Sequence, residues 1–178
     1  VLEMFVVGNN LRELVQKHNI VENVNDVDET CIELRLHKVI RRFHITNTID
    51  TLKYGDPIPK EIGIKETVGN EGLTLKPNET VLACSKQQIF LPQGFMGMVQ
   101  TKGSLARMFV FAQCSDSQID SGFRGRVTFE LFNASPFNII INKGQKIANL
   151  YIMMGSDKNV KKYQGKYNLA DEPTLQKP

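Results

Sequence analysis

Residues Thr101 to Arg107 form a short segment whose side chains are suited to binding an anion. Lys102 and Arg107 are cations, and an Arg guanidinium can bind phosphate through two parallel hydrogen bonds. Ser104 is expected to be the N-cap of a short helical turn, whose free backbone N–H groups would face the same phosphate. The alternative is ordinary helix capping beside two surface cations, and the pattern by itself favours that alternative.

Two acidic residues lie in the segment from Ser117 to Asn133. Apolar side chains recur at every second position from residue 127 to residue 132, which predicts a strand with Glu130 in its middle. A carboxylate buried there is costly unless it is paired, and a raised pKa would suit it to acid–base catalysis. A solvent-facing glutamate on an edge strand is an equally good interpretation. Asp120 lies in a Gly-containing turn and is more simply explained as a turn-forming residue.

The last stretch, residues 156 to 178, differs in composition from the rest of the chain. It has five lysines and few aliphatic side chains, so it cannot form a core by itself. Its most distinctive part runs from Lys162 to Lys166 and contains Tyr163 and Gln164. The simpler interpretation is a frayed basic end, and the alternative is an arm that folds over an anionic ligand.

Length and composition restrict the classes of function. The 178 residues fit one domain, and 41% hydrophobic with 23% charged residues is ordinary for a globular protein. The net charge of +3 argues against a strongly basic nucleic-acid binder. No apolar run approaches the ~20 residues of a membrane span, and no cleavable signal pattern opens the chain. We therefore expect a cytoplasmic protein that binds neither nucleic acid nor membrane.

Motifs of several metal- and cofactor-dependent enzymes are missing from the sequence. Cys31, Cys84 and Cys114 lie far apart without a Cys-x-x-Cys pattern, which argues against a disulfide framework and against a cysteine zinc site. No His-x-Glu is followed by Pro-Cys-x-x-Cys, so the zinc deaminase machinery is absent. There is also no Walker-type phosphate loop and no Gly-x-Gly-x-x-Gly.

The elements that must position these residues are mostly short strands. One helix is expected near the start, capped by Asn9 or Asn10 and ended by Asn19, because apolar residues recur between them at helical spacing. The segment from Ile32 to Leu36 then alternates apolar with polar residues. This alternation predicts a half-buried strand with Glu33 on its polar face.

Further short apolar runs recur between Gly, Pro and Asn turn signals. Many short strands with few helices predict an all-β barrel or jelly roll. The runs are Leu73 to Leu75, Val81 to Cys84, Ile89 to Leu91, Met98 to Gln100, Val127 to Phe132, Ile139 to Ile141 and Ile147 to Met153.

Four segments, taken in order and spacing, resemble the trimeric dUTPase and dCTP deaminase superfamily. Ile32 to Leu36 resembles an early strand of the deaminase branch, and Thr101 to Arg107 is similar to the phosphate motif Ser-Ser-x-Ala-Arg. Ile119 to Gly125 looks like the Asp-containing hairpin that holds the nucleoside. Lys143 to Leu150 resembles the later Gly-x-x-Ile-x-x-Leu strand.

Two features of this resemblance favour the deaminase branch. Thr128 to Asn133 fits the pattern Thr-x-Glu-x-x-Asn, with Glu130 at the glutamate of the family's deaminases. The tail from Lys162 to Lys166, with Pro173 to Leu175, is similar to the deaminase tail and unlike the Gly-rich arm of dUTPases. The early Ala-Gly-Tyr-Asp-Leu motif of dUTPases is missing.

The resemblance implies a mainly β fold, a distorted β-barrel or jelly roll of the dUTPase-like type with a short N-terminal helix. Residues 4–155 would form the β domain and residues 156–178 an arm that closes over the active site, while residues 1–3 are expected to precede a natural start at Met4. The resemblance also implies a homotrimer with active sites between subunits. Its ligands would be dCTP or dUTP, with Mg²⁺ on the triphosphate and no zinc.

The resemblance assigns roles to individual residues in converting dCTP to dUTP and ammonia. Glu130 would take a proton from the water that attacks C4 of cytosine, and Asp120 would contact the sugar hydroxyl. Backbone groups between Cys114 and Gln118 would read the base, and Phe123 would pack under the sugar. The phosphates would be held by Lys102, Ser104 and Arg107 and covered by Tyr163, Lys166 and Gln164.

Three functions stay open at this point. The first, which the resemblance favours, is a dCTP deaminase. It could be bifunctional through to dUMP, because Gln118 stands where many deaminases have Arg and bifunctional relatives do not; Asp120 would then orient a second water. The second is a dUTPase, which leaves Glu130 without a role. The third is a non-catalytic nucleotide-binding regulator, because Gly103 stands where the family motif has its first serine.

Overall fold

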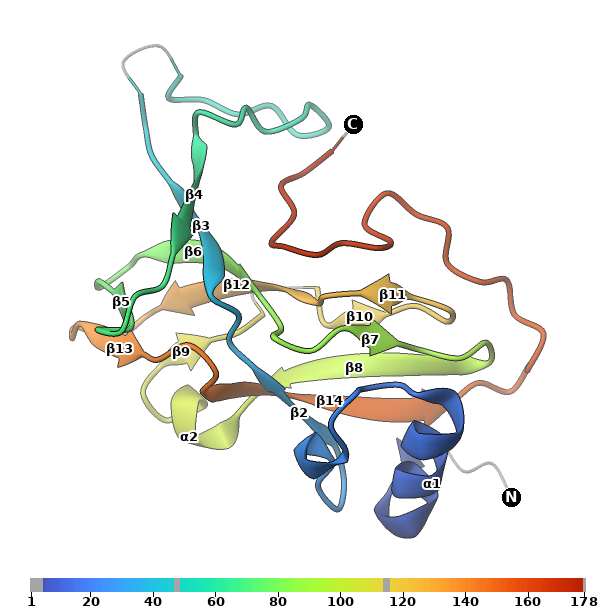
Figure 1. Cartoon of the computed structure of the whole chain (residues 1–178). Helices are drawn as coiled ribbons and strands as arrows, with labels where there is room; N and C mark the ends of the chain where they lie inside the picture. Colours follow the sequence, from blue (N-terminus) through green and yellow to red (C-terminus); the bar gives the residue numbers. More distant parts are fainter. Residues whose placement is uncertain (1–4, 47–48, 114–115, 178) are drawn as a thin grey trace.

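Short strands predominate in residues 5–46, 49–113 and 116–177, which the computed structural model describes (Figure 1). The helices are α1 (Gly8–His18), the 3-10 turn η1 (Val24–Asp26) and α2 (Gly103–Ala106). The strands are β1 (Phe5–Val6), β2 (Ile32–Arg35), β3 (Val39–Phe43), β4 (Gly63–Thr67), β5 (Leu73–Leu75), β6 (Thr80–Cys84), β7 (Ile89–Phe90), β8 (Phe95–Thr101), β9 (Val110–Phe111), β10 (Gln118–Ile119), β11 (Arg124–Gly125), β12 (Thr128–Asn133), β13 (Ile139–Ile141) and β14 (Lys146–Met154).

Two antiparallel sheets form the body of the protein. One has the order β1-β14-β8-β10, with β2 also paired to β14, and the other has the order β4-β3-β6-β12-β9. The small pairs β11-β7 and β13-β5 lie beside them. This is the mainly β architecture that the short apolar runs predicted, and each run named in the sequence analysis lies on or overlaps a strand.

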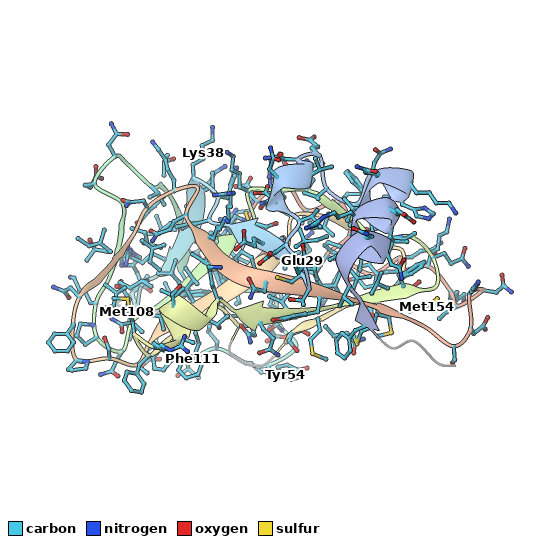
Figure 2. The ribbon with its side chains drawn as sticks, turned by 90° about the horizontal axis from the view of Figure 1, so that it is seen from below. Glu29, Lys38, Tyr54, Met108, Phe111 and Met154 are labelled. Atoms are coloured by element: carbon cyan, nitrogen blue, oxygen red, sulfur yellow. The ribbon has the colours of Figure 1, made fainter. Side chains whose placement is uncertain are left out.

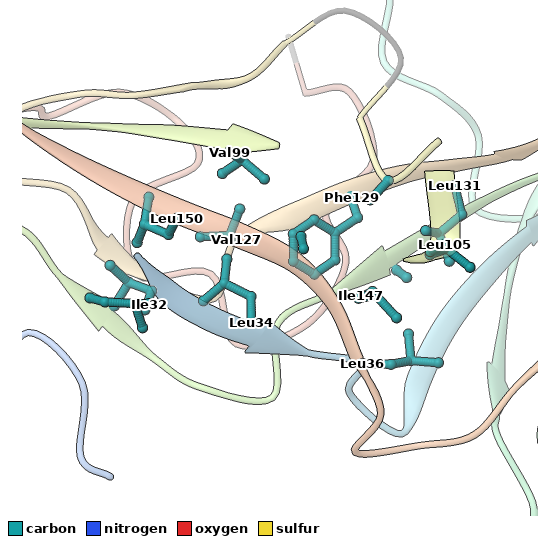
Figure 3. Packing of buried hydrophobic residues seen from close by; sticks show 14 of the residues in the cluster. Ile32, Leu34, Leu36, Val99, Leu105, Val127, Phe129, Leu131, Ile147 and Leu150 are labelled. Carbon is teal, nitrogen blue, oxygen red and sulfur yellow. The ribbon is translucent and has the colours of Figure 1, made fainter. Parts of the chain in front are cut away.

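The apolar core lies between the facing sides of the two sheets (Figure 3). Leu34 of β2 and Leu150 of β14 come from one sheet and Phe129 of β12 from the other, and all three side chains are fully buried. Leu11 and Val15 of α1 are also buried and join the same cluster. The core thus fixes which face of β12 points inward, and positions 128, 130 and 132 face the other way.

The N-terminal helix is present, but its predicted start is wrong. Its N-cap is Val7, which makes no side-chain capping bond, so Asn9 and Asn10 lie inside the first turn. The backbone N–H of Gly8 instead donates to the carbonyl of Glu29 at 2.6 Å. The predicted end is confirmed, because Asn19 is the C-cap in the left-handed conformation at φ 49°.

The hairpin of β3 and β4 was not predicted from the sequence. Arg41 and Arg42 interrupt the apolar pattern of β3, although both side chains are only partly exposed. Arg42 donates to Glu66 on β4 and also pairs with Glu79, so its charge is held by neighbours rather than by water. Between these two strands, residues 49–62 project away from the sheets toward the C-terminal end of the chain (Figure 1).

The tail after β14 is irregular but packed along the protein (Figure 1). Ala170 forms a parallel bridge with Gly125, and the carbonyl of Ala170 accepts from the backbone of Arg126 at 2.7 Å. Farther on, the Nε of Arg41 donates to the carbonyl of Pro173 at 2.9 Å, and Pro173 is buried. The interpretation as a frayed end therefore does not describe this segment.

No helix in the described part of the chain is long and apolar enough to cross a membrane.

Candidate active site

A cavity of about 400 Å³ lies beside β12 and collects several of the predicted site residues. Its wall includes Glu130 from β12, Gln118 from β10, Asp120 and Phe123 from the turn after β10, and Tyr163 from the tail. These five residues span the second and third segments singled out from the sequence. The remaining wall is formed by Phe43, Ile58, Leu82, Val99, Gln113, Asp116, Ser117, Ile119, Arg126, Val127, Thr128, Tyr167, Thr174 and Gln176.

Glu130 faces this cavity because β12 alternates strictly. Its neighbours Phe129 and Leu131 are fully buried in the core, so the Glu130 side chain lies on the opposite face of the strand. Within the sheet, Glu130 is the register partner of Leu82 on the neighbouring strand β6. The Oε2 atom of Glu130 is buried, while the residue as a whole is half-buried. Glu130 therefore lies in the cavity wall with one carboxylate oxygen shielded from bulk water.

Asp120 is held in place by its own turn. Its Oδ1 accepts a hydrogen bond from Nε2 of Gln118 at 2.7 Å, and its carbonyl accepts from the backbone of Phe123 at 3.1 Å. Gly122 completes the turn at φ 81°. Asp120 is thus a turn residue, as its context suggested, and its carboxylate also lines the cavity.

The tail meets the turn between β10 and β11 at the side of the cavity that Phe123 and Tyr163 form. The rings of Phe123 and Tyr163 lie 6.0 Å apart between centroids and are tilted by 46°. The backbone N–H of Tyr163 donates to the carbonyl of Ser121 at 2.7 Å. A Cβ on Gly122 would lie 2.8 Å from the Cβ of Lys162, so only glycine lets the tail pass this close.

The end of the tail closes another side of the cavity. The backbone N–H of Thr174 donates to Oγ1 of Thr128 at 3.4 Å, and the carbonyl of Gln176 accepts from the backbone of Ile58 at 3.2 Å. Lys65 and Glu172 form an ion pair of 2.7 Å beside this contact. The projecting segment before β4 and the last residues of the chain therefore shape one wall together.

The segment from Thr101 to Arg107, which resembles a phosphate motif, differs from its prediction in the position of its N-cap. α2 begins at Gly103, and its N-cap is Lys102, so Ser104 is not the N-cap. The Lys102 carbonyl already accepts from the backbone of Leu105 at 2.9 Å and of Ala106 at 3.0 Å, so the turn starts earlier in the sequence than predicted. Ser104 is exposed on the surface of this turn.

Within one chain the predicted site is split between two surfaces. The three residues of the α2 segment, Lys102, Ser104 and Arg107, do not line the cavity that holds Glu130. Gln164 and Lys166 of the tail are exposed and also lie outside its wall. Lys166 contacts the carbonyl of Lys177 and lies 5.5 Å from the centre of the Tyr167 ring.

Gln113 and Arg126 are among the polar residues of the cavity wall that the sequence analysis did not identify. Oε1 of Gln113 accepts from the hydroxyl of Thr101 at 2.9 Å, which fixes Gln113 against β8. Arg126 donates through Nε to Oδ1 of Asp171 at 3.0 Å and so links the cavity to the tail. Arg126 lies in a segment already singled out, but nothing in its spacing indicated that it faces inward. Cys114 and Ser115, expected to help read the base, lie outside the described residues.

In the described part of the chain, no three or more His, Cys, Asp or Glu side chains are grouped to hold a metal ion. Burial raises the pKa of the Cys84 thiol to about 12, which keeps it protonated. The ionisable groups that line the cavity are instead carboxylates, tyrosines and one arginine.

The family of the chain follows from its sequence similarity. A family model described as dCTP deaminase-like matches residues 5–155. The chain belongs to the dCTP deaminase-like family. The motif resemblance is therefore confirmed, and it covers the whole β body described above.

Individual members of the dCTP deaminase-like family are moderately similar. A dUMP-forming dCTP deaminase of Sulfurihydrogenibium sp. is 34% identical over 67% of this chain and 66% of its own length. A dCTP deaminase of Staphylothermus marinus is 26% identical over 94% of this chain and 96% of its own. The first alignment thus spans about two thirds of that relative.

The fold also matches a solved structure. The dCTP deaminase of Agrobacterium tumefaciens superposes with a TM-score of 0.67 and 14% identity, over 87% of this chain and 49% of that one. At this identity the likeness shows the fold alone. The chain spans about half the length of that protein.

Proposed function

We propose that this protein hydrolyses dCTP to dUTP and ammonia and carries dUTP on to dUMP and pyrophosphate. One observation carries the proposal: Glu130 and Asp120, two carboxylates on different elements, line one cavity of nucleoside size together with the Phe123 ring. The names of similar relatives, several of them dUMP-forming dCTP deaminases, support the same reaction.

In the first step water adds to C4 of cytosine. Glu130 takes the proton of this water, and the proton passes to N3, so that a tetrahedral carbon forms without charge on the ring. A second proton transfer to the amino group lets ammonia leave and restores the carbonyl at C4. A half-buried carboxylate suits this work, since it must accept and return protons within one turnover.

In the second step water attacks the α-phosphate of dUTP, and pyrophosphate leaves. Asp120 would orient this water through its carboxylate, which Gln118 already holds in one direction at 2.7 Å. Asp120 also lies beside Phe123, so a sugar resting on that ring would present its 3′-hydroxyl and phosphate side to the carboxylate. Mg²⁺ would enter with the triphosphate, whose oxygens are its preferred ligands.

The split site supports a homotrimer with active sites between subunits. Lys102, Ser104 and Arg107 would bind the phosphates of a nucleotide seated in the cavity of a neighbouring copy. The surface around α2 and β9 is also unusually apolar for an exposed region: Phe109 is 65% exposed, and Met108 and Phe111 are each 47% exposed. Figure 2 shows the two labelled side chains, Met108 and Phe111, at the same end of the molecule.

The tail would act as an arm over the bound nucleotide. Tyr163 already packs on Phe123, and the exposed Gln164 and Lys166 follow it directly. Small movements of this stretch would bring a cation to the phosphates without disturbing the anchored residues from Ala170 onward. Residues 156–178 would thus form the cover of the site.

The test is to incubate the protein with Mg²⁺ and either dCTP or dUTP and to separate the products by chromatography. We expect ammonia and dUMP from dCTP. Accumulation of dUTP would restrict the proposal to deamination alone. Product from dUTP but not from dCTP would overturn deamination and identify a dUTPase.

Binding without turnover of either nucleotide would favour the regulatory alternative, which Gly103 keeps open. The family motif has a serine hydroxyl at that position, and Gly103 cannot supply it. A matched incubation with the Glu130→Gln variant controls for contaminating enzymes, because a genuine deaminase activity must disappear with that carboxylate.

A further inference from the structure

Glu33 is a charged residue that the proposed reaction does not use, yet it is only 7% exposed. The sequence placed it on the polar face of a half-buried strand, and the structure corrects this. Its Oε1 accepts a hydrogen bond from Nζ of Lys102 at 2.8 Å, and its Oε2 pairs with the ammonium of Lys146. The carboxylate is therefore enclosed between two cations from different elements.

The two ammonium groups keep this carboxylate ionised. Burial by itself raises the pKa of Glu33, but the hydrogen bonds from Lys102 and Lys146 outweigh burial and hold the pKa below its ordinary value. One carboxylate between two cations leaves the cluster with a net positive charge. Glu33 can therefore hold Lys102 while the cluster as a whole still attracts an anion.

Lys102 is fixed at both ends of its side chain. Its backbone N–H donates to the carbonyl of Ile147 at 2.9 Å, and its carbonyl begins α2. Its ammonium is held by Glu33, while 31% of the side chain stays exposed. A lysine normally loses much rotamer freedom when it binds phosphate, and this one has lost it before any ligand arrives.

We propose that Glu33 is a positioning residue that holds the ammonium of Lys102 in place for the nucleotide triphosphate. Lys146 supports it by occupying the second carboxylate oxygen, so that Glu33 stays charged and keeps its bond to Lys102 while the exposed side of that ammonium binds a phosphate. This inference rests on the proposed function, because it takes Lys102 as a phosphate ligand. It adds a residue that the motif resemblance gave no catalytic or binding role.

A second ion pair on the same strand provides a matched control. Asp26 binds Nε of Arg35 at 2.8 Å, and its side chain is 4% exposed against 9% for Glu33. Asp26 also accepts from Gln87 at 2.8 Å, and Arg35 donates to the carbonyl of Gly144. Gln87 donates in turn to the backbone carbonyl of Glu33 at 3.0 Å, so this network reaches the backbone of Glu33 and not its carboxylate. Asp26→Asn should therefore lower stability without changing turnover per folded molecule.

The experiment is a double-mutant cycle on full-length protein with dCTP. Glu33→Gln should lower kcat about tenfold without raising KM, because the site gains positive charge but loses the placement of one cation. In a Lys102→Met background the same substitution should change kcat less than twofold, since there is no ammonium left to position. Asp26→Asn and thermal unfolding of every variant control for loss of fold.

Each outcome decides between positioning and its alternatives. Equal effects of Glu33→Gln in both backgrounds, or lower stability with normal kcat, would overturn the inference and leave Glu33 a structural ion-pair partner. If the wild-type protein binds dCTP but forms no product, the proposed deamination fails. The cycle is then measured on the Kd for dCTP, where an effect of Glu33→Gln that disappears with Lys102→Met still supports the inference and equal effects overturn it.

Discussion

At the scale of single residues, Glu130 is distinguished by the face of β12 on which it lies. A glutamine in its place keeps the shape of the side chain but cannot take a proton from water. We expect Glu130→Gln to lower ammonia release from dCTP by about 10²–10⁴-fold, the usual contribution of general acid–base catalysis. Binding of dCTP, measured by calorimetry, should stay within a few-fold of wild type.

Glu66→Gln is a suitable control for this variant. Glu66 is a partly buried carboxylate on β4 that pairs with Arg42 and does not line the cavity. It should leave ammonia release unchanged. Normal turnover by the Glu130→Gln variant would remove Glu130 from the mechanism altogether.

Gly103 permits a test of the missing motif hydroxyl. A Cβ built on Gly103 would have as its nearest neighbour the Nη1 of Arg107 at 3.3 Å, the movable end of a flexible side chain. A serine therefore fits, and we expect Gly103→Ser to raise kcat for ammonia release severalfold. The substitution also removes a glycine from the first turn of α2, which should add about 0.5–1 kcal/mol of stability.

Gly103→Ala separates the two effects, because it adds the Cβ without the hydroxyl. Both variants should unfold at higher temperature than wild type, while only the serine variant should be faster. An equal rate in the two variants would show that the hydroxyl at this position plays no part in the reaction.

At the scale of elements, periodicity predicted β12 well and β2 only in part. In β12 Phe129 and Leu131 enter the core as the alternation predicted, so Glu130 lies on the opposite face. The pattern left open whether that face meets solvent or a cavity. In β2 the same alternation placed Glu33 in water, but cations distant in sequence, Lys102 and Lys146, bury it. A strand pattern reports which face meets the core and cannot report what covers the other face.

The strand β3 was missed for a related reason. Arg41 and Arg42 interrupt its apolar pattern, because Arg41 holds the tail through the Pro173 carbonyl and Arg42 pairs with two glutamates. Only the motif residues of the cavity could be predicted from the sequence. Its wall from Ile58 and Gln176 depends on an irregular segment and a tail without periodicity, so no local pattern could bring them together.

The tail end can be displaced by a single methyl group. Gly63 of β4 lies under Leu175, and a Cβ there would be 2.5 Å from Cδ2 of Leu175. We expect Gly63→Ala to push Leu175 and its neighbours away from the cavity and to raise the KM for dCTP roughly tenfold, the effect of about 1.4 kcal/mol. Stability should change little, because the contact involves the end of a side chain rather than backbone.

Leu175→Ala removes the same contact from the tail and should produce a similar rise in KM. Steady-state kinetics with dCTP, alongside thermal unfolding, measures both variants. A normal KM in both would mean that the anchored end of the tail does not shape the substrate site.

At the scale of the whole molecule, His37 couples stability to pH. Burial lowers the pKa of His37 below its ordinary 6.5, and Arg126 lowers it further. Its Nδ1 accepts from the backbone of Val39 at 3.3 Å, which also favours the neutral ring. As the pH falls below 6.5, the unfolded chain takes up this proton before the folded protein does, so the free energy of unfolding falls until the pH reaches the folded pKa.

We therefore expect His37→Gln to flatten the loss of stability as the pH falls through and below 6.5. Urea unfolding at several pH values measures this slope. Gln16→Ala, which changes a non-ionisable exposed residue of α1, should leave the slope as it is in wild type. An unchanged slope in the His37 variant would assign the acid sensitivity to carboxylates instead.

The division of the site between two surfaces has a consequence for mixed assemblies. If the cavity of one copy works with the α2 segment of the next, Glu130→Gln and Arg107→Ala damage different halves of each site. Homotrimers of either variant should be nearly inactive. When the two are unfolded, mixed in equal amounts and refolded, about a quarter of the sites should combine an intact cavity with an intact α2 segment, because cyclic head-to-tail contacts join neighbours at random.

Recovered ammonia release near that fraction would therefore establish that one active site is built from two chains. Mixing without unfolding is the control, since it should restore activity only as fast as subunits exchange. If each chain instead folds its own α2 segment onto its own cavity, every site in a mixed trimer carries one damaged half and no activity returns. The apolar surface around Phe109 would then need another partner, because a site completed within one chain gives that surface no part in catalysis.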